Sequence, residues 1–276
     1  MKKNNSRFAI LVVGFDGYSD LWNPFFELLR KNWENCQYKI YFVTNVKKPV
    51  IQGIHVITTE SDCQWSTKTV KALNMIDEDF VYLLLEDYFI CDKVNENRLE
   101  ELFDYIIQND IKYVKTPFKS AIVRKKIPFK DKKDYYCIPK NLEYGISLLP
   151  GIWDKNYLLG LIGNKDYNPW QFEVDRIKET RDQNSDPFVD KFVTYINPLN
   201  LYNGVIQGKY DNRTYKLVKK QRIDLPIGRI GRMKKGEEVI FYTKTLAYKF
   251  CPESLKQYLK KIARIFGISF VTDKNM

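Results

Sequence analysis

The sequence predicts an α/β fold in which a mostly parallel sheet is covered by helices on both faces. Short apolar runs alternate with amphipathic, helix-like segments along the first half of the chain. The runs are nearly continuous in apolar residues, which is typical of parallel strands buried on both faces. Hydrophobic residues make up 44% of the 276 residues, with 19 Tyr and 17 Phe, so the chain can build a large core.

Strands are predicted in the first half wherever a short apolar run is bounded by polar or turn-forming residues. The run 8–13 (FAILVV) ends at Gly14-Phe15-Asp16-Gly17, and the run 80–85 (FVYLLL) ends at Glu86-Asp87. The other predicted strands are 38–44, 53–58 and 111–116.

Helices are predicted between these strands at 23–33, 65–76 and 95–108. The first opens with Asn-Pro, and the second has Ser66 or Thr67 as a candidate N-cap. The third has the clearest helical spacing in the chain, with apolar residues at 99, 102, 103, 106 and 107.

The second half of the chain is less regular. Residues 119–141 are lysine-rich without a clear period, which indicates a mobile loop or a strand pair. A strand and turn are expected within 142–155, helices over 157–162 and 168–180, and strand-like structure over 201–210. Residues 251–266 predict a basic amphipathic helix at the end of the chain.

Composition excludes several kinds of site. A single histidine, His55, lies in an apolar run, so a His-based triad or a histidine-rich zinc site lacks its residues. Five cysteines without a CxxC pair indicate reduced thiols in a cytosolic protein. No apolar run approaches the ~20 residues of a membrane-spanning helix, and the six-residue run near the start does not fit a signal peptide.

The positive charge is concentrated at the end of the chain. Residues 201–276 hold 17 Lys/Arg and 6 Asp/Glu, a net of +11, whereas residues 1–200 hold 28 of each. This basic region indicates either an acidic partner, such as a membrane, nucleic acid or phosphate-bearing substrate, or simply a solvated lysine-rich face.

Polar residues follow three of the predicted strands: Asp16 the first, Asn45 the second, and Glu86 with Asp87 the fourth. In parallel sheets, ligands bind beyond the carboxyl ends of the strands. Two adjacent carboxylates there suit Mg²⁺ or Mn²⁺, which prefer one or two carboxylates plus substrate phosphate oxygens. A helix cap or a pairing with lysine is the structural alternative.

The pattern resembles the bacterial GT-A-type glycosyltransferases that build capsule and lipopolysaccharide chains from nucleotide sugars. The resemblance extends over roughly residues 8–210 and is a pattern without one decisive signature. Its matching pieces are Phe15-Asp16-Gly17, Tyr41-Phe42-Val43-Thr44-Asn45, Trp65-Ser66 with Lys68, Leu85-Glu86-Asp87-Tyr88-Phe89, Tyr144-Gly145-Ile146-Ser147, Gly151-Ile152-Trp153 and Pro169-Trp170-Gln171-Phe172-Glu173.

The resemblance implies a GT-A-like domain over 1–210, with a nucleotide-sugar half over about 1–118 and an acceptor half over 119–210. Residues 211–276 would form a basic C-terminal extension that contains the amphipathic helix.

The resemblance also implies roles for the donor side. Glu86-Asp87 stands where the family has its DXD motif, so Asp87 would hold a cation that bridges the diphosphate. This chain reads Leu85-Glu86-Asp87, without the first aspartate, and a contact of Asp87 with the ribose or the donor sugar therefore stays open. Phe15 and Asp16 would lie near the base and ribose.

Further donor contacts are expected around the same edge of the sheet. Ser66 and Lys68 begin a helix whose N-terminus favours anions, and Asn45 ends the second strand. Lys209, after a strand-like segment, is a candidate for the diphosphate. The alternatives are a turn at Phe15-Asp16, a solvated helix start and a surface lysine.

An inverting transfer needs a base that deprotonates the acceptor hydroxyl, and without a suitable histidine a carboxylate is the default. Glu173 is the candidate and Asp175 the second choice. Trp170 lies one helical turn before Glu173 and could be a platform for a sugar ring. Tyr144 and Trp153 are further acceptor-side candidates, although Trp153 and Trp170 could both be core residues.

The resulting expectation is a glycosyltransferase that moves a sugar, first of all from a UDP-linked donor, to a hydroxyl of a capsule or lipopolysaccharide acceptor. Its partners would be the nucleotide sugar, a lipid-linked or oligosaccharide acceptor, and an anionic membrane surface. It would be cytoplasmic and peripheral on the inner face of the membrane. A non-catalytic polyanion- or nucleic-acid-binding protein is the alternative, which the separation of aromatic and basic residues disfavours.

Overall fold

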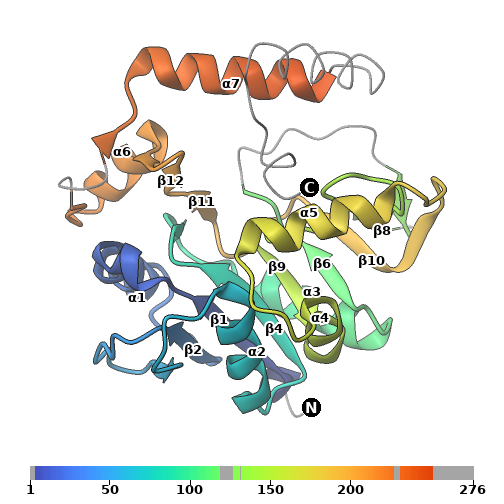
Figure 1. Cartoon of the computed structure of the whole chain (residues 1–276), viewed down its shortest axis with the longest axis horizontal. Coiled ribbons are helices and arrows are strands. Elements are labelled where there is room, and N and C mark those ends of the chain that lie inside the picture. Colours follow the sequence, from blue (N-terminus) through green and yellow to red (C-terminus); the bar gives the residue numbers. More distant parts are fainter. Residues whose placement is uncertain (1–3, 119–126, 131, 227–230, 251–276) are drawn as a thin grey trace.

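The computed structural model describes residues 4–118, 127–130, 132–226 and 231–250. A nine-stranded sheet, ordered β3-β2-β1-β4-β9-β6-β10-β8-β7, forms the centre of the molecule. Helices cover both of its faces, as Figure 1 shows. The predicted α/β fold class is confirmed.

The central sheet begins with a parallel block, in which β1 (Phe8–Val13) lies between β2 (Lys39–Thr44) and β4 (Phe80–Leu85) and β2 also pairs with β3 (His55–Thr58). Next come β9 (Gly151–Asp154), antiparallel to both of its neighbours, and β6 (Tyr113–Lys115), which pairs in parallel with β10 (Pro187–Thr194). At the far edge β8 (Lys132–Pro139) runs antiparallel to β10 and to β7 (Pro128–Phe129).

Two small sheets lie outside this centre. β5 (Tyr88–Ile90) pairs antiparallel with β11 (Leu201–Asn203). β13 (Lys209–Tyr210) pairs with β12 (Val205–Ile206) and with β14 (Gly231–Arg232). The first pairing brings residues separated by more than one hundred positions to the end of β4.

Helices α3 to α6 begin after a residue whose side chain caps them, whereas α1 and α2 have no side-chain cap. The N-cap predicted at Ser66 or Thr67 is wrong, because α2 already begins at Trp65. Asn95 caps α3 by accepting the Arg98 N–H, and Asn168 caps α5 by accepting the Gln171 N–H just before Pro169. The helices are α1 (Trp22–Asn32), α2 (Trp65–Met75), α3 (Glu96–Gln108), α4 (Lys155–Ile162), α5 (Pro169–Thr180), α6 (Asn212–Lys220) and α7 (Lys235–Phe250), and 3-10 turns form at Asn4–Arg7 and Asp16–Leu21.

Strand β1 divides the core into two layers because its side chains alternate between the faces of the sheet. Phe8, Ile10 and Val12 pack against α1 and α3, with the Phe8 and Phe103 rings stacked at 3.8 Å between centroids. Leu11 and its alternate neighbours pack against α2, α4 and α5 on the other face. Truncating Leu11 to Ala is expected to cost about 2–5 kcal/mol of folding free energy.

Several elements differ from the sequence-based prediction. The segment before β9 is a turn rather than a strand, and the strand-like stretch 201–210 forms three short strands. Strand β10 and helices α6 and α7 were not predicted; β10 begins with Pro187 and is exposed over its first half, so it has no apolar run. The amphipathic helix predicted for 251–266 lies outside the described residues. Within the described part of the chain, no helix is long and apolar enough to cross a bilayer.

Candidate functional site

The carboxyl ends of β1, β2 and β4 lie side by side, and they bring the polar residues that follow these strands together. The Glu86 Oε1 atom accepts a hydrogen bond of 3.0 Å from the Phe15 N–H. The Gly14 N–H donates to the Val43 carbonyl at 2.9 Å, which fixes the first strand exit against the second. The ends of these three strands are therefore connected by hydrogen bonds.

Asp16 holds the loop after β2 in place. Its carboxylate accepts hydrogen bonds from the backbone N–H groups of Asn45, Val46 and Lys47 at 2.9, 2.9 and 2.8 Å. Burial alone would raise the pKa of Asp16, but these three donors and the Lys68 charge outweigh it and lower the pKa below its usual range. Asp16 is therefore ionised, and its carboxylate holds the loop after β2 against the end of β1. Its contact with a ribose stays a prediction.

Lys68, Asn45 and Ser66 are buried, and their polar atoms are used inside the protein. The Lys68 ammonium, on a side chain only 3% exposed, donates to the Gly14 carbonyl (2.5 Å) and to Asn45 Oδ1 (2.8 Å). The Asn45 amide in turn donates to the carbonyls of Ser61 and Cys63.

The Ser66 hydroxyl donates to the Lys165 carbonyl at 2.8 Å and accepts from the Tyr167 N–H at 2.7 Å. Direct donor contacts by Asn45 and Ser66 are thus corrected to supporting roles, because each side chain is enclosed and its hydrogen-bonding groups are occupied. Lys68 faces inward, where desolvation lowers its pKa while the charges of Glu86 and Asp16 oppose that effect.

Glu86 and Asp87 are adjacent acidic residues, and both have a raised pKa. Burial, followed by the neighbouring Asp87 charge, raises the pKa of Glu86 to about 8, against hydrogen bonds from the Phe15 and Glu86 backbone and the charge of Lys68. Burial raises the pKa of Asp87 to about 7. The Asp87 Oδ1 atom is itself buried and has no hydrogen-bond partner among the described residues. A buried carboxylate oxygen without a partner is costly, so this atom is suited to a ligand.

A divalent cation fits this pair only together with substrate oxygens. Among the described residues no group of three or more His, Cys, Asp or Glu side chains comes together as a ready-made metal cage. One or two carboxylates plus phosphate oxygens is, however, the donor set that Mg²⁺ and Mn²⁺ commonly use. The unpaired Asp87 oxygen is the observation in this structure that fits such an ion.

The predicted base candidate lies close to the same acidic pair. Glu173, on α5, accepts a hydrogen bond from the Leu148 N–H at 3.1 Å, and the Tyr88 hydroxyl donates to the Leu148 carbonyl at 3.0 Å. Burial raises the pKa of Tyr88 well above its usual value, and the charges of Asp87, Glu173 and Glu86 add to this. The charges of three carboxylates, two adjacent after β4 and one on α5, thus act on one buried phenol.

The environment of Glu173 makes it a better base than a solvated glutamate. Burial raises its pKa, while the Leu148 hydrogen bond and the Lys115 charge oppose that rise. A carboxylate with a raised pKa binds a proton more strongly, which suits general base catalysis near neutral pH. By contrast, the Asp175 carboxylate accepts from Gln171 Nε2 at 2.7 Å and pairs with Lys178 on the surface of α5.

The aromatic residues predicted on the acceptor side separate into exposed and buried ones. Trp170 is 61% exposed at the start of α5, and Tyr144 is also exposed, with a left-handed backbone conformation (φ 58°). Trp153 is fully buried and lies beside Tyr113, with ring centroids 4.1 Å apart. An enclosed indole cannot contact an acceptor, so the prediction for Trp153 is wrong and this residue belongs to the core.

Lys209 and Phe15 are both partly exposed, and they differ in that Lys209 already has a charged partner. The Lys209 ammonium pairs with Glu237 of α7 at 2.6 Å, and its diphosphate contact stays a prediction. The Phe15 side chain is 47% exposed, with the Lys68 ammonium 5.4 Å from its ring centroid. The exposed part of the ring is available to a ligand.

Several residues of the site were missed in the sequence. Lys115 ends β6, and its ammonium donates to the Tyr144 carbonyl while its charge acts on Glu173. The rule of strand ends that selected Asp16 would also have selected it. Asn203 Oδ1 and Ser147 Oγ are buried and have no hydrogen-bond partner among the described residues. Nothing local in the sequence marks Asn203, and Ser147 was only part of a matching piece, without a role.

The approach of β11 to β5 requires a glycine. The Gly204 N–H donates to the Asp87 carbonyl at 2.7 Å. A Cβ atom at Gly204 would lie 2.8 Å from the Phe89 ring and 2.9 Å from that same carbonyl oxygen, too close for any other residue without movement. The backbone of Asp87 is therefore held from a distant part of the chain.

Fold and site together define an α/β protein with two carboxyl groups of raised pKa at the carboxyl edge of its parallel strands, which is the candidate site. No protein-family model matches the sequence, and no curated protein matches it.

Similar solved structures include residues 1–349 of TarS from S. aureus, with 13% identity and a TM-score of 0.43 over 68% of this chain and 60% of that chain. The same TarS segment in complex with UDP-GlcNAc has 12% identity and a TM-score of 0.44 over 88% of this chain and 73% of that chain. A cytidylyltransferase from Leptospira borgpetersenii serovar Hardjo-bovis has 13% identity and a TM-score of 0.39 over 64% of this chain and 71% of that chain. These TM-scores assign neither a family nor an activity, so the function rests on the side chains of the site.

Proposed function

We propose that the protein is a glycosyltransferase that moves a sugar from a nucleoside diphosphate donor, first of all a UDP-sugar, to a hydroxyl of a surface-glycan acceptor. The single observation that carries this proposal is the buried, unpaired Asp87 Oδ1 next to Glu86, at the carboxyl end of β4. The sequence resemblance to GT-A-type enzymes, with Asp87 at the DXD position, supports the same assignment.

The donor would lie over the ends of β1 and β4. The exposed Phe15 ring offers a stacking face for the base, and Asp16 lies beside it near the ribose. A Mg²⁺ or Mn²⁺ ion held by Asp87 and the diphosphate would neutralise the charge that develops on the leaving group. Glu86, whose pKa is about 8, can donate a hydrogen bond near neutral pH when it is protonated.

Glu173 would act as the general base on the opposite side of the sugar. Its free oxygen takes the proton of the acceptor hydroxyl while the hydroxyl oxygen forms a bond to the anomeric carbon. The bond from that carbon to the diphosphate oxygen breaks, and the electron pair leaves with the nucleoside diphosphate. A single direct displacement of this kind inverts the anomeric centre. The Leu148 N–H orients the carboxylate for this role.

The acceptor would lie along the start of α5. Trp170 lies one helical turn before Glu173, and its exposed indole can stack on the apolar face of a sugar ring. Exposed Tyr144 adds a second aromatic contact. The acceptor class that we propose is a capsule or lipopolysaccharide glycan, held near an anionic membrane by the basic residues beyond 201.

Donor turnover by two matched variants tests the proposal. Asp87→Ala removes the carboxylate at the carboxyl end of β4, and Asp79→Ala removes an exposed carboxylate just before the amino end of the same strand. With a panel of UDP-sugars and Mn²⁺, we expect Asp87→Ala to lose hydrolysis and transfer and Asp79→Ala to keep both, with unchanged circular dichroism. Wild-type turnover by Asp87→Ala would refute the assignment. Binding of single-stranded nucleic acid in place of UDP would favour a non-catalytic function.

A further inference from the structure

A cavity separate from the acidic edge, which is formed by Asp16, Glu86 and Asp87, lies against the C-terminal half of α5. Its volume is about 200 Å³. Arg176, Glu179 and Thr180 line it from the same face of α5, at the helical spacing of three and four residues. The helix rises 1.5 Å per residue, so Thr180 lies about 15 Å along α5 from Trp170. The cavity is therefore displaced along α5 from Trp170, while Leu142 and Ile146 of its lining flank Tyr144 in the sequence.

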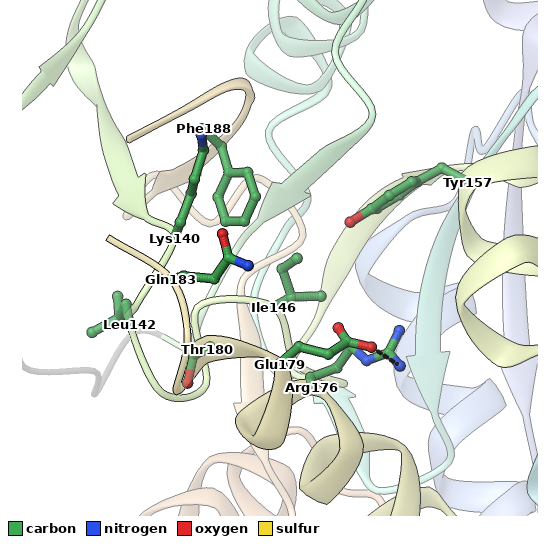
Figure 2. Close-up of a pocket in the computed structure, with 9 residues that line it drawn as sticks. All are labelled: Lys140, Leu142, Ile146, Tyr157, Arg176, Glu179, Thr180, Gln183 and Phe188. Atoms are coloured by element: carbon green, nitrogen blue, oxygen red, sulfur yellow. Dashed lines mark ion pairs between the residues drawn. The ribbon is translucent and has the colours of Figure 1, made fainter. Parts of the chain in front are cut away.

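Both hydrogen-bond donors and hydrogen-bond acceptors face this cavity. Figure 2 shows the Tyr157 hydroxyl and the Gln183 carboxamide pointing into it from opposite sides. No hydrogen bond of either group is found among the described residues, so both keep donor and acceptor capacity. Arg176 Nη2 and Glu179 Oε1, which also line this space, form an ion pair of 2.6 Å.

The cavity also has a rigid apolar side. Phe188 and Ile146 line it together with Leu142. The buried Lys191 ammonium lies 4.5 Å from the Phe188 ring centroid and 4.7 Å from that of Tyr157, and it pairs with Asp190 at 2.7 Å. One cation, paired with Asp190, thus contacts both aromatic rings and favours their observed positions.

The charges decide which ligand suits this arrangement. Arg176 and Glu179 neutralise each other, so Lys140 is the only charge outside that pair among the lining residues that the structure describes. A phosphate or another multiply charged anion would find a single lysine, and a cation would find no free carboxylate. A neutral polyol matches the mixture of donors and acceptors, and its C–H face matches the Phe188 ring.

We propose that this cavity is a carbohydrate subsite that holds one neutral pyranose ring. The volume of about 200 Å³ lies below the roughly 300–1,000 Å³ of sites for drug-sized ligands, which suits a small ligand such as a single ring. The inference does not rest on the transfer reaction, since every residue that carries it lies outside the acidic edge. If the proposed transfer is correct, the subsite would hold a unit of the acceptor away from the reacting hydroxyl.

Saturation-transfer NMR on the full chain, without nucleotide or metal, tests the proposal. The probes are the methyl pyranosides of glucose, galactose and N-acetylglucosamine, with inorganic phosphate and acetate as the anionic arm. We expect saturation of at least one glycoside with a Kd of order 1 mM, and no displacement by phosphate or acetate at equal concentration.

Two matched substitutions on β10 locate the binding. Phe188→Ala should weaken the glycoside about 3- to 10-fold, the usual scale of one aromatic contact. Val189→Ala should leave it unchanged, because Val189 is 76% exposed and its side chain lies on the other face of the strand.

Two further variants keep the test valid if Phe188→Ala does not fold. Gln183→Ala alters an exposed residue, and Tyr157→Phe keeps the ring but removes the hydroxyl; each should weaken binding about 3- to 10-fold. Asp87→Ala should bind the glycoside as the wild type does, which separates this subsite from the transfer site. Absence of glycoside binding, displacement by phosphate, or binding that Phe188→Ala, Gln183→Ala and Tyr157→Phe leave unaltered would overturn the proposal.

Discussion

The protonation of the acidic pair makes folding stability depend on pH in a distinctive direction. Burial raises the pKa of Glu86 from 4.5 to about 8, so the folded protein binds this proton more tightly than the unfolded chain does. The stability that this proton supplies is fully present below the unfolded pKa. It is lost as the pH rises through the folded pKa, between roughly pH 5 and pH 8.

The size of the effect follows from the shift. At 1.36 kcal/mol per pKa unit, the change from 4.5 to about 8 corresponds to about 5 kcal/mol over the whole titration. The window from pH 5 to pH 8 contains most of it, about 3 kcal/mol, because the unfolded group is already largely ionised at pH 5. For a chain of this size, that corresponds to a fall in Tm of about 6–12 °C.

Glu86→Gln removes this contribution, while Asp87 still titrates in both proteins. The neutral amide cannot titrate, and its oxygen can still accept the hydrogen bond from the Phe15 N–H. Urea unfolding at pH 5, 6, 7 and 8 should show the variant gaining about 3 kcal/mol relative to the wild type across the series. Glu60→Gln, which alters an exposed glutamate paired with Lys48, serves as the control without this trend. A constant difference between Glu86→Gln and the wild type at all four pH values would refute the reasoning.

Three further predictions concern the proposed reaction. Glu173→Gln should lower turnover by roughly 10²–10⁴ while UDP binding by calorimetry stays nearly unchanged, and unaltered turnover would move the base to Asp175. Trp170→Ala should raise the acceptor KM about 3- to 10-fold and leave the donor KM unchanged, and an equal change in both would show a general loss of structure. Deletion of 252–276 should abolish flotation with anionic liposomes and retain donor hydrolysis, and a shortened protein that still floats would end the membrane proposal.

The parallel half of the fold was predictable because its strands can be recognised from the local sequence alone. The predicted bounds of β1 and β4 are those of the structure, since both are continuous apolar runs that end abruptly at polar residues. The reversed direction of β9 was not predictable in the same way. The side-chain pattern of a short buried strand is the same for either direction, and the choice depends on the distant strands β4 and β6 that flank it.

The location of the acidic edge was predictable, but the role of each of its side chains was not. Strand ends selected Asp16, Asn45 and the Glu86-Asp87 pair, and parallel pairing places them together. A sequence does not show which polar atoms are already occupied. Only their hydrogen bonds show that Lys68 and Ser66 are bonded within the protein and support the site. Asp87 Oδ1, by contrast, has no partner among the described residues.

The pairing of β11 with β5 also limits how the chain can be divided into pieces. A fragment that ends at residue 200 would leave β5 as an open edge and remove the Gly204 N–H that holds the Asp87 carbonyl. The buried Leu201 side chain would be lost from the core with it. If the chain were split there and supplied as two polypeptides, a functional acidic edge would form only on their reassociation, so activity would depend on the concentration of both pieces. The last quarter of the sequence is thus a structural partner of residues that precede it by more than one hundred positions.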